Sequence, residues 1–100
     1  MQLNLFEDIN IKQEGIEYVA EMIIKCDSIR GFIKQAIINN DKKELVKLFN
    51  ESIRTFGFSG PNMWSWGMGT LETPDRTQKF KVTAEELADA AIKLEVTSCT

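Results

Sequence analysis

The residue types that most enzymes use for catalysis are scarce in this chain. It contains no histidine, which removes the commonest general base and the Ser–His and Cys–His nucleophile pairs. The two cysteines, Cys26 and Cys99, form no spaced motif of the kind that binds zinc. Residues 57–61 carry part of a nucleophile elbow, but Pro61 replaces the final glycine and no base is available. We therefore expect no enzyme, no catalytic residue, no metal and no cofactor.

Three carboxylates gather near the C-terminus. Glu85, Glu86 and Asp89 fall on one predicted helix and could together hold a divalent cation. Acidic residues in the first turn of a helix are explained more simply, because they interact favourably with the helix dipole. We prefer that interpretation to a cation site.

The most unusual segment is 60–69, which holds two tryptophans, two methionines and three glycines. Tryptophan is enriched at interface hot spots, and methionine adapts to irregular surfaces. Trp64, Trp66 and Met68 are therefore the candidate partner-binding residues. The alternative is that both tryptophans cover the helices from one face of a sheet and belong to the core.

Charge is unevenly distributed along a chain whose formal net charge is −3. Residues 25–54 carry seven Lys/Arg against four Asp/Glu, which is compatible with a local basic patch. Three helices followed by a hairpin is also the order of a winged helix. Our alternative function is thus a winged-helix-like DNA-binding regulator that uses helix 41–56 and the hairpin 63–82. Its nucleic-acid-binding candidates are Lys42, Lys43, Lys47, Arg76, Lys79 and Lys81, with Arg54 near the same phosphates.

Hydrophobic spacing predicts the elements that must position these residues. Apolar residues recur at helical spacing over 13–26, 29–39, 41–56 and from Thr83 onward. Asp41 with Glu44, and Thr83 with Glu86, have the spacing of capping boxes. Residues 63–82 alternate with period two around a turn at 73–76, and we interpret them as a β-hairpin. Residues 3–11 alternate loosely, which favours a short strand or an extended arm.

This order of elements predicts an α+β fold with three N-terminal helices, a hairpin and a C-terminal helix. One hundred residues make a single domain, and we expect 1–100 to form one, with an ordered core over about 3–95 and a tail at 96–100. The predicted core is Ile16, Val19, Ile23, Phe32, Ile33, Ile37, Leu45, Phe49, Ile53, Phe56, Phe80, Leu87 and Ala91.

The partner is expected to be another protein. Residues 1–8 lack a basic region followed by an apolar run, and no run approaches the length of a membrane span. We therefore expect a cytoplasmic protein with no membrane partner, and a homodimer is compatible with the sequence. The favoured function is a small non-catalytic protein–protein interaction domain. Its size, acidity and composition suggest a phage or mobile-element protein that binds or inhibits a host protein.

Overall fold

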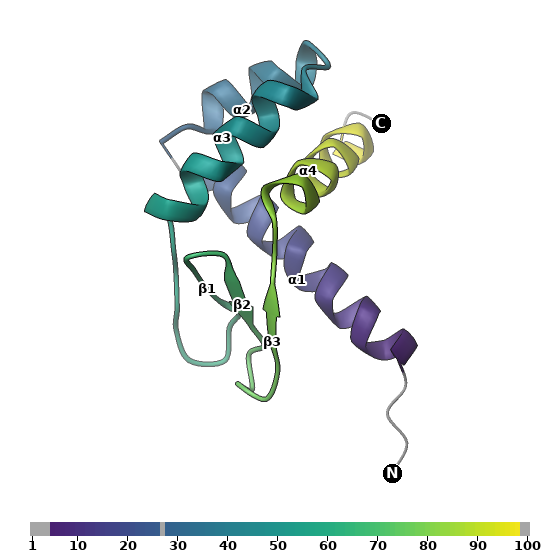
Figure 1. Cartoon of the computed structure of the whole chain (residues 1–100), viewed down its shortest axis with the longest axis vertical. Coiled ribbons are helices and arrows are strands. Elements are labelled where there is room, and N and C mark those ends of the chain that lie inside the picture. The colour runs from purple at the N-terminus through teal and green to yellow at the C-terminus, as the bar shows by residue number, and fades with distance from the viewer. Residues whose placement is uncertain (1–4, 27, 99–100) are drawn as a thin grey trace.

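A computed structural model describes the backbone of residues 5–26 and 28–98, and the side chains of 10–26 and 28–95. Four helices and a three-stranded antiparallel sheet pack around one core (Figure 1), which confirms the α+β class. The elements are α1 (Leu5–Cys26), α2 (Arg30–Ile38), α3 (Lys42–Thr55), β1 (Ser65–Gly67), β2 (Thr70–Glu72), β3 (Lys79–Lys81) and α4 (Ala84–Ser98). Within the described residues, no helix combines the length and apolarity needed to cross a membrane.

Both predicted helix caps are present. The Asp41 carboxylate accepts a hydrogen bond of 3.1 Å from the Glu44 backbone N–H at the start of α3. At the start of α4, the Glu86 N–H donates to the Thr83 hydroxyl, and the Thr83 N–H donates to the Glu86 carboxylate. These bonds satisfy backbone groups that have no partner inside the helix, so the sequence sets where α3 and α4 begin.

Helix α1 is longer than the sequence suggested. It begins at Leu5 rather than near residue 13, so the prediction of a strand or arm over 3–11 is wrong for its described residues. Gly15 lies inside this helix because the sheet approaches it closely. A Cβ atom at Gly15 would lie 2.5 Å from Leu71 Cδ2 and 2.7 Å from the Trp64 ring, closer than packed atoms come.

The sheet is where the structure departs most from the prediction. Segment 63–73 is not one strand, because the chain reverses at Met68 and Gly69, whose φ angles are 51° and 80°. Two successive residues with positive φ form the tight turn that matches the twist of a hairpin. The predicted turn over 73–76 is also present and leads into β3. The hairpin is therefore replaced by a three-stranded sheet in the order β1-β2-β3.

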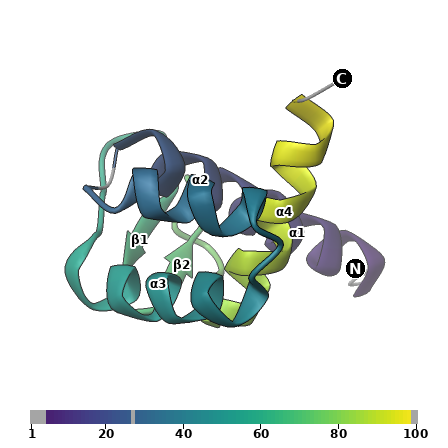
Figure 2. The same cartoon turned by 90° about the horizontal axis from the view of Figure 1, so that it is seen from above.

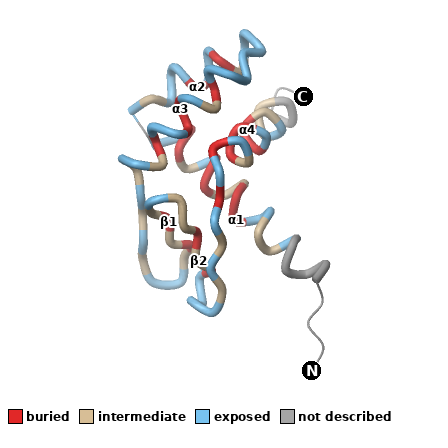
Figure 3. Tube along the Cα trace, viewed as in Figure 1, coloured by how far each residue is buried: buried red, intermediate tan, exposed pale blue. Residues whose placement is uncertain are grey.

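The core lies between the sheet and the helices. Helix α1 runs behind the sheet, α2 and α3 lie across one end of it, and α4 packs beside α1 (Figures 1 and 2). Figure 3 shows that the buried residues gather where these elements meet. The largest fully buried side chains are Phe49, Ile23, Ile33, Leu45, Leu71, Leu87 and Val19.

Two predictions at the margins of the core are wrong. Phe32 was expected inside but is 67% exposed, because α2 buries only Ile33 and Ala36. Successive residues of a helix point about 100° apart, so Phe32 falls at the edge of that narrow buried face. The tail expected at 96–100 is helical as far as Ser98, and 99–100 lie outside the described residues.

Candidate functional site

Trp64 and Trp66 lie on the sheet face that packs against the helices. They are 8% and 2% exposed, and Trp64 lies close to Gly15 of α1. Among the described residues, the buried Nε1 of Trp66 has no hydrogen-bond partner. Both rings thus belong to the core, as the alternative interpretation of this segment expected, and a role for Trp64 and Trp66 in binding a partner stays a prediction.

Met68 differs from both tryptophans. Its side chain is 76% exposed at the tip of the turn between β1 and β2. The turn rests against the rest of the domain, since a Cβ at Gly69 would lie 3.6 Å from Ile53 of α3 and 3.8 Å from the Val82 carbonyl oxygen. The fold therefore holds Met68 in a defined place and points it at solvent.

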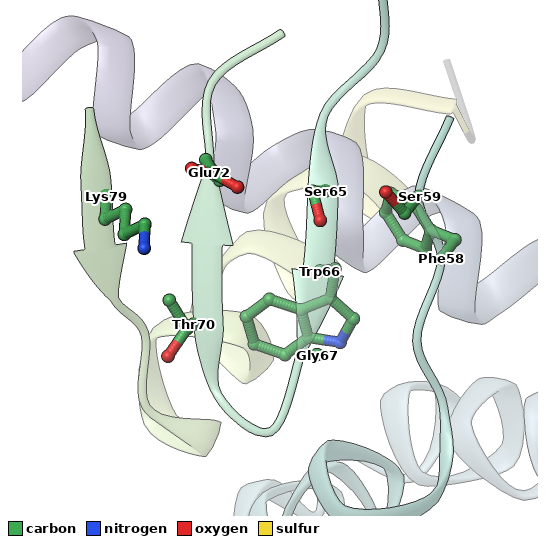
Figure 4. Close-up of a pocket in the computed structure, with 8 residues that line it drawn as sticks. All are labelled: Phe58, Ser59, Ser65, Trp66, Gly67, Thr70, Glu72 and Lys79. Atoms are coloured by element: carbon green, nitrogen blue, oxygen red, sulfur yellow. The ribbon is translucent and has the colours of Figure 1, made fainter. Parts of the chain in front are cut away.

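The outer face of the sheet forms a shallow, open pocket of about 490 Å³. Figure 4 shows Glu72 and Lys79 on adjacent strands of this face, where the register pairs them directly. A Cβ atom at Gly67 would meet nothing within 4 Å, so the centre of the pocket is open. The lining residues are Phe58, Ser59, Ser65, Trp66, Gly67, Thr70, Glu72 and Lys79.

Arg76 was a candidate for contacting phosphate at the tip of a wing, but it has a structural role. Its guanidinium donates to the carbonyl oxygens of Met63 and Gly60, each at 2.7 Å, and to that of Thr73 at 3.0 Å. These bonds join the loop before β1 to the turn before β3. These contacts assign Arg76 a structural role, and a phosphate contact by this side chain stays a prediction.

The six lysine and arginine candidates are distributed over α3, the turn before β3 and β3 itself. Lys42 forms an ion pair of 2.8 Å with Asp89 of α4, and the hydrogen bond that Lys42 donates to this carboxylate raises the pKa of Lys42. Lys43 and Lys47 are exposed on α3, whereas Lys79 and Lys81 are exposed on β3. The structure therefore divides the predicted DNA-binding set into two pairs, with Lys42 and Arg76 engaged elsewhere.

On α3, three of the predicted nucleic-acid-binding candidates lie in line with Asn50, which was not part of the predicted site. Lys43, Lys47, Asn50 and Arg54 are all exposed, and their spacing of i, i+4, i+7 and i+11 places them along one line of the helix. We call these four residues the α3 stripe. Within the part of the chain that the structure describes, no ion pair engages its three cations. The 3.6-residue period of the helix was enough to find this stripe.

The C-terminal carboxylates separate rather than gather. Glu86 bonds the cap residue Thr83 and pairs with Lys12 at 3.2 Å, while Asp89 pairs with Lys42. No cluster of three or more potential metal ligands occurs in the described portion of the chain. The two paired carboxylates join α4 to α1 and α3.

Comparison with known proteins adds no assignment, since no family model, curated protein or solved structure matches this chain.

Proposed function

We propose that this domain is a non-catalytic protein-binding module and that Met68 lies at the centre of its contact surface. The observation that carries the proposal is the position of Met68, which is 76% exposed and adopts a φ of 51°. Each of these properties has a cost. A large apolar side chain is left in water, and a side chain other than Gly, Asn or Asp is strained by roughly 1 kcal/mol or more in the left-handed region.

A turn selected only for folding would carry a different residue. Asn-Gly and Asp-Gly are strongly preferred in two-residue turns of this kind, and Gly69 already fills the second position. Methionine at the first position contributes nothing to the turn, but it offers a flexible apolar contact to a partner. Strain retained at one exposed residue therefore supports a binding role.

The experiment separates binding from folding with one substitution. Met68→Asn should raise the free energy of unfolding by up to about 1 kcal/mol, because asparagine suits the left-handed turn, and should abolish capture of the partner. The matched control is Ile38→Asn, since Ile38 on α2 is 75% exposed and should be neutral. Affinity capture from cells that make the protein, quantified by mass spectrometry, would compare the proteins captured by the wild type, by Met68→Asn and by Ile38→Asn. The proposal fails if Met68→Asn retains every protein that the wild type captures.

The role of a phage or mobile-element protein that inhibits a host protein stays a prediction. Identification of the captured protein would test it directly, and an inhibitor should reduce the activity of that protein in a purified mixture.

The α3 stripe favours nucleic-acid binding as a second candidate. Three unpaired cations on one exposed helix face could contact successive phosphates. Two facts count against recognition in the manner of a winged helix. Helices α2 and α3 run side by side in opposite directions (Figure 2), rather than crossing at about 90–120°, and the whole chain has a net charge of −3.

A gel shift at low salt tests this second candidate. Lys43→Glu combined with Lys47→Glu should abolish binding to duplex DNA, whereas Arg30→Glu combined with Lys34→Glu makes the same charge change on α2 and should not. With three phosphate contacts, the logarithm of the binding constant should fall against that of salt with a slope of about −3. Equal shifts by both double variants would contradict a role for the stripe.

A further inference from the structure

The sheet has two edges, and among the described residues only one of them is bonded to another segment of the chain. Beside β1, Phe58 and Trp66 exchange two backbone hydrogen bonds of 2.9 and 2.8 Å. The other edge is β3, which pairs with β2 on one side only. We call the outward side of β3 the β3 edge. An open edge presents backbone donors and acceptors to any extended chain that approaches it.

The hydrogen-bonding pattern identifies the residues that face outward. The Gln78 carbonyl accepts from the Thr73 N–H, and the Val82 N–H donates to the Gly69 carbonyl, so both point toward β2. Backbone groups alternate in direction along a strand. The N–H and C=O groups of Lys79 and Lys81 therefore point away from the sheet, and no bond to another described residue involves them.

An added strand at the β3 edge would have parts of the domain to pack against. In Figure 1, α1 crosses behind the segment that leads from β3 into α4 and continues past it. A strand added about 4.8 Å outside β3 would therefore lie on the side of the sheet toward which α1 continues. Phe80 is only half-buried on the inner face, and an apolar residue of the added strand would cover its ring.

Charge on the β3 edge determines which chain can fill it. The side chains of Lys79 and Lys81 lie on the outer face and are exposed. A second copy of β3 in antiparallel pairing would set these lysines against each other, and like charges directly opposite are destabilising. An acidic strand would instead place opposite charges in the same positions.

We infer that the β3 edge binds an extended segment of a partner protein in which acidic residues alternate with apolar residues. The inference rests on the proposed protein-binding function and adds the chemistry of the partner. The acidic side chains would lie beside Lys79 and Lys81 on the outer face. The apolar side chains would pack on Phe80 and on α1, as in other cases of strand addition.

Amide hydrogen exchange measured by NMR tests this inference with two short blocked peptides, one alternating glutamate with valine and the other lysine with valine. The glutamate peptide should slow exchange of the Lys79 and Lys81 amides by about tenfold or more, and the lysine peptide should leave them unchanged. Lys79→Glu combined with Lys81→Glu should reverse this preference. Arg30→Glu combined with Lys34→Glu, the same charge change on α2, should keep it.

A variant that alters only the backbone separates strand addition from simple charge attraction. Lys81→Pro removes an outward N–H and leaves the bonds between β2 and β3 intact, since proline is tolerated at the free side of an edge strand. It should weaken binding of the glutamate peptide, and Lys81→Gln, which keeps the N–H, should weaken it less.

Three results would overturn the inference. The first is that the glutamate peptide does not slow exchange of the Lys79 and Lys81 amides, and the second is that both peptides slow it equally. The third is that, without any peptide, exchange of these amides slows as the protein concentration rises, which would identify a second copy of the domain as the occupant. If Met68→Asn fails to capture the partner and one of these three results is also obtained, the β3 edge is not the binding surface. The proposed protein-binding function would still be supported in that case.

Discussion

Gly15 and Gly31 both lie within helices, but their surroundings are opposite. Gly15 of α1 touches the sheet, whereas a Cβ at Gly31 of α2 would meet nothing within 4 Å. Gly31→Ala should raise the free energy of unfolding by about 0.5–1 kcal/mol, because alanine loses less backbone entropy in a helix. Gly15→Ala should lower it by about 1–3 kcal/mol through overpacking against Leu71 and Trp64.

Chemical denaturation of the two variants measures this difference. Opposite signs are expected, and a stabilising Gly15→Ala would mean that α1 can move away from the sheet without loss.

At the level of residues, the sequence did not predict which of three similar apolar side chains is exposed. Trp64, Trp66 and Met68 looked alike as large apolar residues at alternate positions. Only Met68 reaches solvent, because a turn replaces the strand at that point. Methionine is not a turn former, so no local signal marked the reversal. The contacts of Arg76 span 13 and 16 residues of sequence and could not be inferred from spacing.

The capping interaction at the start of α4 should make the stability of the fold depend on pH. Burial raises the pKa of Glu86, but hydrogen bonds from the Thr83 N–H and from Lys12 outweigh it and hold the pKa below its usual value. A carboxylate with a lower pKa in the folded chain stabilises the fold above its unfolded pKa, and this contribution disappears as the pH falls through the folded value.

Glu86→Gln should therefore lower the thermal midpoint near neutral pH, and its deficit relative to the wild type should shrink as the pH is lowered toward about 3. Thermal melts across this range measure the deficit. Glu85→Gln is the control, since it removes the same charge one residue earlier without touching the cap. A deficit that stays constant with pH would contradict the assignment.

The starts of the two capped helices were predicted correctly, α2 was predicted to within one residue at each end, and only the start of α1 was missed. Asp41 and Thr83 marked α3 and α4 correctly. The start of α1 was missed because the loose alternation of apolar residues over 3–11 is typical of a strand, whereas the chain is helical from Leu5 onward. The short strands of the sheet depend on pairing across the chain, which local periodicity cannot reveal.

For the molecule as a whole, the two lysines of β3 have a second consequence. If they also keep copies of the domain apart, Lys79→Thr combined with Lys81→Thr should create a neutral edge of good strand formers that pairs with itself. Sedimentation at rising protein concentration should show self-association of this variant while the wild type sediments unchanged. If the double variant sediments like the wild type at every concentration, the two lysines are not needed to prevent self-association.

Burial of both tryptophans gives the domain an optical reporter of its own assembly. An indole emits at shorter wavelength when it is shielded from water. Trp64 meets α1 across a long separation in sequence, so fluorescence follows the docking of the sheet, whereas far-ultraviolet circular dichroism follows the four helices. If the domain unfolds as one cooperative unit, the two melting curves coincide. A fluorescence transition that precedes the loss of ellipticity would mean that the sheet detaches from a helical bundle that is still folded.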